Sequence, residues 1–408
     1  MWLLRRAVIS VLQVLIRIIF YPWFAYLDFR NAQELKRHGD VLSKRQLRDA
    51  TTGTFCVFHL FPRQKLPASA IRALKTLEAQ GVNLVIISNG AIPEADLPLI
   101  DSVAHTVIVR RNIGRDFGGY RTGVLHVLDT FRPERILIVN DSVFYRSGGL
   151  EAFFTALSDT SKDYVGAAEN HEFGYHVGSY ALGFGPRVFQ SPHFRKFWEN
   201  YQLSELRPKV IRTGEIALNR TVIGAIGVNP TVVYSPRKLG EALAELPTTE
   251  LILTASQMPG HFNERDALRK LHQTASQWFE TSGENSTNRD APLPIEAAAS
   301  LADTDAGDVR RLVSANYRKQ LERSLMDFVF RGSQIHWGAL PLVKHLNCPI
   351  IKADLVLRGI YGVGELSAFA PSMSAEEYDE FFAMCTRRGV PQQHWNLAQR
   401  MMLAVGYI

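Results

Sequence analysis

The chain has 408 residues, of which 46% are hydrophobic and 21% are charged, as in an ordinary globular protein. Its 46 lysines and arginines stand against 40 aspartates and glutamates, and this formal charge of +6 is too small and too dispersed to indicate nucleic-acid binding. Three widely spaced cysteines without a CxxC pair argue against a disulfide framework or a zinc site, so we expect reduced thiols in the cytoplasm.

The first 27 residues form a mostly apolar segment that polar positions interrupt. These positions recur on one helical face, while Leu, Val and Ile occupy the opposite face. Tryptophan and tyrosine bracket the segment, as they do at membrane–water interfaces. We therefore expect an amphipathic helix over residues 1–30 that lies in the membrane interface, with a membrane span and a protein-docking helix as the alternatives. The polar positions are Arg6, Ser10, Gln13 and Arg17.

Strand-like and helix-like segments alternate from about residue 53 onward. Helices are expected near residues 70–81, 93–101 and 119–130, between apolar, β-branched segments that predict strands. This order predicts an α/β fold with a doubly wound (Rossmann-like), mostly parallel sheet that helices flank. The predicted strands cover residues 54–61, 83–89, 105–111, 135–141, 163–169, 179–185 and 231–235.

The last third of the chain has a different composition. Residues 281–307 are polar, small and acidic, which predicts a flexible segment. A helix is expected from residue 309 to about residue 331, and mixed helices follow it. We therefore expect an α/β domain over residues 50–245 and a helical region over residues 246–408.

A glycine-rich motif, NIGRDFGGY (residues 112–120), directly follows the third predicted strand. In open parallel sheets, ligands bind outside the carboxyl ends of the strands. The glycines allow close approach of the backbone, and Arg115 and Asp116 can hold phosphate or sugar hydroxyl groups. The alternative interpretation is a structural ion pair between Arg115 and Asp116 within a turn.

A second motif, Asn140-Asp141-Ser142, ends the fourth predicted strand. A carboxylate flanked by short oxygen-bearing side chains can hold a hard divalent cation that bridges to phosphates. The alternative is an Asx turn in which Asp141 or Ser142 caps the next segment. Because both motifs lie at neighbouring strand ends of one predicted sheet, we favour a ligand site.

At these residues the chain resembles the rhamnan synthesis F family, glycosyltransferases of rhamnose-rich polysaccharides with the nucleotide-sugar-binding fold called GT-A. The resemblance covers roughly residues 53–240 and 330–365, and the pairing of NIGRDFGGY with LIVNDSV (residues 137–143) is its most specific part. Softer matches are HLF (59–61), SYALGFGPRVFQSPHFRKFW (179–198), TGEIALNRTVIGAIG (213–227) and SQIHWGALPLVKHLNCPIIKADLVL (333–357).

The resemblance implies a site for a nucleotide-diphosphate sugar, dTDP-rhamnose first, with Mg²⁺ or Mn²⁺ on its diphosphate. Asp141 would stand where such enzymes carry a metal-binding acidic motif, although a single carboxylate is a weak metal site. His59 would lie near the nucleotide, and a core or turn histidine is an equal alternative. The other residues that would bind the donor are Asn112, Arg115, Asp116, Asn140 and Ser142.

Inverting sugar transfer also needs a carboxylate that takes the proton of the acceptor hydroxyl. Glu215 is the first candidate, in the expected first turn of a helix capped by Thr213, where a structural helix-start glutamate is the alternative. Glu169, at the end of the fifth predicted strand, is the second candidate. His336 and Lys352 are candidates for binding acceptor phosphate, and an ordinary surface role is the favoured interpretation for both.

The resemblance therefore implies transfer of a sugar, rhamnose first, to a growing lipid-linked cell-surface polysaccharide at the cytoplasmic face of the bacterial inner membrane. The helical region would complete the acceptor side. A catalytically degenerate scaffold of a membrane polysaccharide-assembly complex is the alternative, because the Asn-Asp-Ser motif holds only one carboxylate. A phosphatase of the haloacid dehalogenase type is disfavoured, because its nucleophilic aspartate is missing from the end of the first strand.

Overall fold

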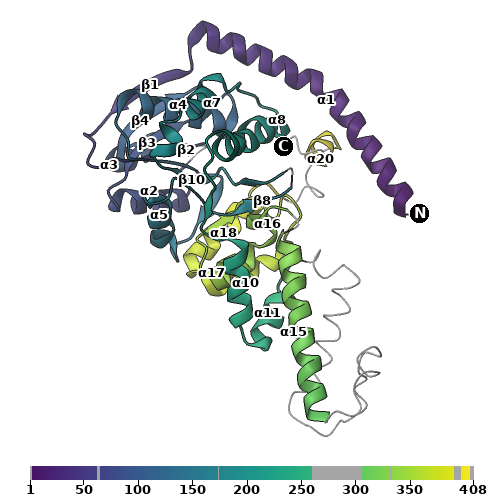
Figure 1. The fold of residues 1–408 in the computed structure, drawn as a ribbon. Helices are drawn as coiled ribbons and strands as arrows, with labels where there is room; N and C mark the ends of the chain where they lie inside the picture. The colour runs from purple at the N-terminus through teal and green to yellow at the C-terminus, as the bar shows by residue number, and fades with distance from the viewer. Residues whose placement is uncertain are drawn as a thin grey trace.

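The structure is a computed structural model that describes residues 2–61, 65–172, 174–259, 306–330, 332–389 and 397–404. In Figure 1 a long helix, α1 (Trp2–His38), runs along the outside of an α/β body, and a second long helix, α15 (Ala306–Phe330), extends away from the other end. The predicted flexible segment 281–307 lies outside the described residues, except that α15 contains its last two.

The central sheet contains eight strands: β1 (Val41–Gln46), β2 (Thr54–Leu60), β3 (Asn83–Ser88), β4 (Ala104–Arg110), β5 (Arg135–Asn140), β7 (Tyr164–Gly166), β10 (Ala181–Phe184) and β11 (Thr231–Val232). Their order is β1-β4-β3-β2-β5-β10-β7-β11. Strands β4, β3, β2 and β5 are parallel, as are β7 and β11, whereas β1 and β10 run antiparallel to their neighbours. The predicted mostly parallel α/β sheet is therefore confirmed.

The helices and helical turns of the described chain are, besides α1 and α15, α2 (Ala68–Ala79), η1 (Glu94–Asp96), α3 (Leu97–Val103), α4 (Arg115–Thr130), α5 (Leu150–Ser158), α6 (Pro186–Phe189), α7 (Pro192–Asn200), α8 (Arg207–Val210), η2 (Ile211–Ile216), α9 (Ala217–Arg220), η3 (Thr221–Ala225), α10 (Pro236–Glu245), α11 (Thr248–Ser256), α16 (Gln334–Trp337), α17 (Ala339–Leu346), η4 (Gly364–Ser372), α18 (Ala375–Thr386) and α20 (Leu397–Ala404). Helices α4 and α7 cover one face of the sheet, and α2 and α5 cover the other. Alternate strand residues point to opposite faces, so Ile138 and Val139 enter different cores.

Three local features differ from the sequence-based expectations. Strand β1 was not predicted, because all six of its residues are exposed and show no apolar alternation. Helix α4 begins at Arg115, so the glycine-rich motif forms the start of this helix instead of preceding it. The segments α8, η2, α9 and η3 form one continuous helix from residue 207 to 225. Thr213 therefore lies inside a helix and is not a cap; its hydroxyl donates to the carbonyl of Lys209 at 2.8 Å.

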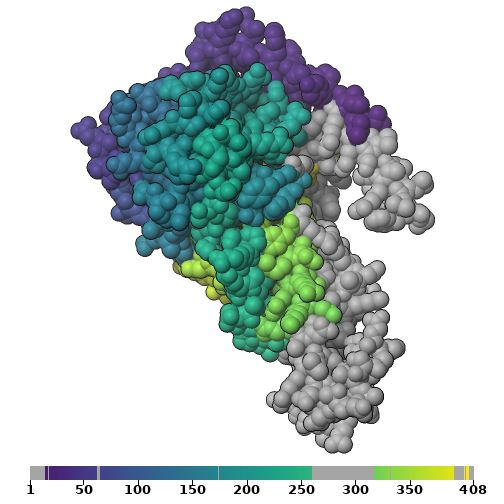
Figure 2. Space-filling model, in the orientation of Figure 1, coloured from purple at the N-terminus to yellow at the C-terminus, as the bar shows by residue number. Residues whose placement is uncertain are grey.

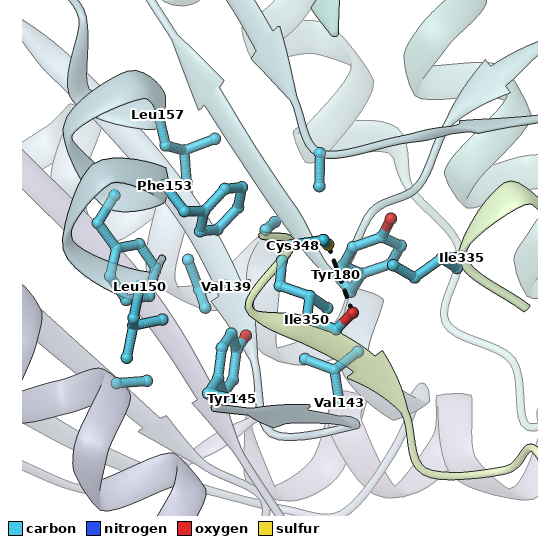
Figure 3. Close-up of a cluster of buried hydrophobic side chains, with 14 of the residues drawn as sticks. Val139, Val143, Tyr145, Leu150, Phe153, Leu157, Tyr180, Ile335, Cys348 and Ile350 are labelled. Carbon is cyan, nitrogen blue, oxygen red and sulfur yellow. Dashed lines mark hydrogen bonds between the residues drawn. The ribbon is translucent and has the colours of Figure 1, made fainter. Parts of the chain in front are cut away.

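The C-terminal region contributes to the core of the α/β body. Strand β12 (Ile350–Lys352) pairs antiparallel with β6 (Val143–Tyr145), which directly follows β5. In Figure 3, Cys348 and Ile350 lie beside Tyr180 in a cluster that also contains residues of β5 and α5. Buried residues from both sides of position 245 thus share one core.

Helix α1 confirms the predicted N-terminal helix and extends it to His38. Ile16 and Phe24 are buried against Leu206, and α20 packs alongside them. Within the part of the chain that the structure describes, no helix has both the length and the apolar character needed to cross a bilayer. Figure 2 shows α1 on the outer rim of the molecule. Large apolar side chains remain exposed on it: Val14, Leu15, Ile18, Ile19, Tyr21, Trp23, Tyr26 and Phe29.

Candidate functional site

The topology of the sheet defines one place for a ligand. From β2 the chain continues to β3 and β4 on one side, and it then returns to β5 on the other side of β2. Open α/β sheets bind ligands at the carboxyl ends of the two strands that flank such a reversal. His59 of β2 lies opposite Asn140 of β5 in this parallel pair, and the Asp141 N–H donates to the carbonyl of His59 at 3.2 Å.

Helix α4 brings a second carboxylate to this point. Asp116 lies in the first turn of α4, where its Oδ1 accepts from the Phe117 N–H at 3.0 Å. The side-chain amide of Asn140 approaches the other carboxylate oxygen of Asp116 at 3.4 Å. The structure therefore brings together four of the predicted site residues: His59, Asp116, Asn140 and Asp141.

His59 is enclosed at the centre of this group. It is 4% exposed, and Gly119 of α4 packs directly on its ring. Burial lowers the pKa of His59, and the fields of Asp141 and Asp116 only partly oppose this effect. Its Nε2 has no hydrogen-bond partner among the described residues. A neutral histidine with an unused ring nitrogen thus lies at the switch point of the sheet.

Asp141 is partly exposed and makes a defined contact, because its Oδ2 accepts from the Phe61 N–H at 2.9 Å. Burial raises the pKa of the Asp141 carboxyl, and His59 acts in the opposite direction. The described residues contain no group of three or more His, Cys, Asp or Glu that could hold a metal ion. These residues alone do not form a divalent-cation site, so Mg²⁺ or Mn²⁺ would need oxygen ligands from a bound diphosphate as well.

The Asx-turn interpretation of Asn140-Asp141-Ser142 holds for part of the motif. The Oδ1 atom of Asn140 accepts from both the N–H (3.1 Å) and the hydroxyl (2.7 Å) of Ser142. This turn satisfies Asn140 locally and leaves Ser142 exposed. Asp141 takes no part in the turn and instead bonds across to the segment after β2.

The loop before α4 has a constrained backbone. Gly114 and Arg115 both adopt the left-handed conformation, with φ of 83° and 54°, which is unfavourable for a side-chain-bearing residue such as Arg115. Glu205 stabilises this conformation: its carboxylate accepts from the Gly114 N–H at 2.6 Å, and its carbonyl accepts from Arg115 Nε at 2.9 Å. Burial lowers the pKa of Arg115. Asn112 stays exposed next to this loop.

Sequence analysis missed Asn89, which follows β3 and is 4% exposed. The side-chain oxygen of Asn89 accepts from the guanidinium of Arg110 at 2.7 Å, and its side-chain amide nitrogen donates to the backbone carbonyl of Arg115 at 3.1 Å. Asn112 also lies within 3.4 Å of this amide. The available signal was an Asn-Gly pair at a strand end, the same type of position as the other two motifs.

Both candidate bases are linked to a small hairpin of β8 (Glu169–Asn170) and β9 (His176–Val177), in which Glu169 is the first residue. Glu169 follows the carboxyl end of β7, on the same edge of the sheet as Asp141, and accepts from the Tyr175 hydroxyl at 3.2 Å. Glu215 lies 3.8 Å from Nε2 of the buried His176. The described contacts do not join either glutamate directly to the His59 group.

His336 is buried, so the expected surface role is wrong for this residue. Its Nδ1 lies 2.7 Å from the hydroxyl of Ser333, and its Nε2 lies 3.0 Å from Asp354. Lys352 is half-buried, with its ammonium 4.5 Å above the ring of Tyr180. The contacts of His336 with Asp354 and of Lys352 with Tyr180 were not visible in the sequence, because they join residues from different segments.

The fold and this group of side chains define an α/β protein with a cluster of polar side chains at the switch point of its sheet. The family described as rhamnan synthesis protein F matches residues 84–259 of the chain, which contain β3, β4, β5 and the start of α4. The resemblance to that family is therefore confirmed over these residues.

A second comparison gives one curated relative. The chain is 26% identical over 204 residues to the uncharacterized protein y4gN of Sinorhizobium fredii (strain NBRC 101917 / NGR234). The aligned part is 49% of this chain and 53% of that protein. The chain thus spans about half the length of the curated relative that it matches.

Proposed function

We propose that the chain is a GT-A-type glycosyltransferase that moves rhamnose from dTDP-rhamnose to a growing, lipid-linked cell-surface polysaccharide. The observation that carries this proposal is the convergence of His59, Asp116, Asn140 and Asp141 at the switch point of the sheet. Three of these four residues fall inside the segment that matches rhamnan synthesis protein F.

In this proposal Asp116, Asn140 and the loop around Arg115 bind the donor. The buried His59 packs against Gly119 of α4 and helps to hold this helix in place. Asp141 would hold Mg²⁺ or Mn²⁺ only together with diphosphate oxygens, and no step of the transfer is assigned to the metal. Glu215 or Glu169 would take the proton of the acceptor hydroxyl. Both glutamates have a histidine nitrogen within 4 Å of a carboxylate oxygen, His171 for Glu169 and His176 for Glu215.

A scaffold without activity is the second candidate function. The single carboxylate of the Asn-Asp-Ser motif favours it, because the loss of metal ligands is one way in which such a site would decay. The two candidates differ in one measurable property, namely turnover of a nucleotide sugar.

We expect the purified chain to hydrolyse one donor slowly from a panel of nucleotide sugars, with dTDP-rhamnose as the first candidate. Arg115→Ala should reduce this hydrolysis at least about tenfold, because Arg115 would lose its contact with the diphosphate. Arg187→Ala, at an exposed arginine with a weak surface ion pair, is the matched control and should be unaffected. A wild type that neither binds nor hydrolyses any donor would favour the scaffold, whereas donor binding without hydrolysis would mean that the acceptor is required. Equal hydrolysis by Arg115→Ala would remove Arg115 from the site.

We also propose that α1 rests on the cytoplasmic face of the inner membrane. Its exposed apolar and aromatic residues have basic side chains nearby, as interfacial helices do. Asp28 accepts from the hydroxyl of Ser204 at 2.7 Å and from the N–H of Glu205 at 3.1 Å. Because Glu205 also holds the loop of Arg115, this helix is anchored next to the proposed donor site.

Replacing Ile18, Ile19 and Trp23 together by serine should weaken binding to anionic vesicles about tenfold or more. Each of these side chains is more than half exposed, so its apolar area would be available for burial in the lipid interface. Vesicle flotation with phosphatidylglycerol measures this binding. The matched control is Leu253→Ser with Val363→Ser, two exposed apolar residues away from α1. Equal flotation of both variants would contradict a membrane role for α1.

A further inference from the structure

Lys352 lies next to the proposed site although it falls outside the segment that matches the family. The pairing of β12 with β6 places it opposite Val143, the residue that follows Ser142. Its ammonium lies 4.5 Å above the ring of Tyr180, and the carbonyl of Tyr180 accepts from the Asn140 N–H at 3.2 Å. The strand register therefore holds a half-buried cation beside the carboxyl end of β5.

Asp354, two residues after Lys352, is surrounded by positive or protonatable groups. Its carboxylate accepts from Arg358 at 2.6 Å and lies 3.0 Å from His336. Burial alone would raise the pKa of Asp354. His336, Lys352 and Arg207 outweigh burial and lower the pKa of this carboxyl well below its ordinary value. Arg358, Lys352 and Arg207 are permanently charged and act on the carboxylate of Asp354. This one negative charge cannot neutralise all three positive charges.

Arg207 is a second half-buried cation in this part of the molecule. It begins the helix over residues 207–225 and acts electrostatically on both Asp354 and Arg115. Neither Arg207 nor Lys352 forms an ion pair or a side-chain hydrogen bond with any residue in the described ranges. Removing a cation from water costs free energy unless an anion compensates for it. The one carboxylate on which both cations act, Asp354, is already hydrogen-bonded to Arg358, so an anionic ligand would compensate their charge.

We propose that Lys352 and Arg207 bind the phosphate oxygens of a diphosphate ester between the carboxyl end of β5 and strand β12. A diphosphate carries two or more negative charges, and lysine and arginine are the side chains that bind it most effectively. This proposal rests on the proposed transferase function and identifies the protein groups that neutralise the diphosphate.

The ester has two sources in such a reaction, the nucleotide of the donor and the lipid carrier of the acceptor. In transfer, the bond between the anomeric carbon and the β-phosphate oxygen breaks, and its electron pair stays on the leaving nucleoside diphosphate. The acceptor oxygen forms the new bond to the anomeric carbon and gives its proton to a carboxylate. Cations on the leaving diphosphate would compensate this charge, whereas cations on the lipid diphosphate would anchor the acceptor.

The test measures dissociation constants for dTDP, dTMP and farnesyl diphosphate in the full chain by calorimetry. Lys352→Met and Arg207→Met should each weaken binding of one diphosphate about 10- to 100-fold, with little effect on dTMP. Lys352→Arg should restore most of the affinity, because it keeps the charge. Lys75→Met, at an exposed lysine of α2, is the matched control and should bind as the wild type does. Unchanged melting temperatures establish that the variants are folded.

Each outcome separates this proposal from the transferase itself. Loss of dTDP affinity assigns the cations to the donor, and loss of farnesyl diphosphate affinity assigns them to the acceptor. Lysine-dependent binding without turnover of any nucleotide sugar, in the presence of a lipid-linked oligosaccharide acceptor, would leave this site standing and overturn the transferase. Normal turnover and normal affinities in Lys352→Met and Arg207→Met would overturn this site alone. A wild type that binds no diphosphate would overturn both.

Discussion

Asp141→Asn is expected to lower donor turnover by about 100-fold or more, the size of effect seen when one preorganised electrostatic contact is removed from an active site. The same change should leave the melting temperature equal or slightly higher. Burial raises the pKa of Asp141 above its value in the unfolded chain, so its ionised form costs folding free energy at neutral pH. Asparagine removes that charge, and its side-chain oxygen can still accept from the Phe61 N–H.

Donor hydrolysis and calorimetric melting, measured on the same preparation, check this prediction. The matched control is Asp129→Asn, which changes an exposed carboxylate at the far end of α4 whose ion-pair partner among the described residues is the surface residue Arg195. Its turnover should equal that of the wild type, because exposed ion pairs contribute little. Wild-type turnover in Asp141→Asn would remove Asp141 from the site, and a lower melting temperature would contradict the argument from its pKa.

Gly119→Ala should destabilise the protein by about 1–3 kcal/mol, although alanine normally favours a helix over glycine. A Cβ atom at this position would lie 2.1 Å from Cδ2 of the His59 ring, far inside van der Waals contact. The ring is 4% exposed at the centre of the site, so it can move only by displacing its neighbours. We therefore expect donor turnover to fall together with stability.

Urea denaturation measures this effect, and Gly240→Ala in α10 is the matched control. A Cβ at Gly240 meets only Met326 at an ordinary 3.4 Å, so this change should stabilise the protein by about 0.5–1 kcal/mol. In a His59→Ala background the added Cβ has room, and Gly119→Ala should then cost much less. Equal costs in the two backgrounds would show that the clash with His59 is not the cause.

The two motifs at the strand ends show how much of the site can be predicted from residues that are neighbours in the sequence. Runs of β-branched and apolar residues predicted β2, β3, β4 and β5 to within one or two residues, because buried parallel strands need such runs. The polar residues that follow these strands then had to lie on one edge of the sheet. His59, Asn140 and Asp141 could be placed on one edge on that basis, although their hydrogen bonds could not. The expectation that the two motifs follow neighbouring strands was wrong, because β3 and β2 lie between β4 and β5, and helix α4 brings Asp116 to Asn140.

The helix that carries Glu215 shows where local reasoning failed. Thr-Gly-Glu has the composition of a helix start, and it was interpreted as one. In the structure the helix begins at Arg207, and Gly214 packs against the ring of Phe117 of α4, where no side chain would fit. Tertiary packing therefore explains this glycine, and no signal within the segment distinguishes the two cases.

The sequence was sufficient for the α/β class, the positions of the main strands along the chain and the two motifs at their ends, because burial and turn chemistry act on neighbouring residues. Only the tertiary structure showed that β12 joins β6, that Asn89 supports Arg115, and that Lys352 lies over Tyr180. These contacts join segments that are tens to hundreds of residues apart. Such pairings depend on how whole faces pack together, and that packing leaves no periodic pattern in either segment.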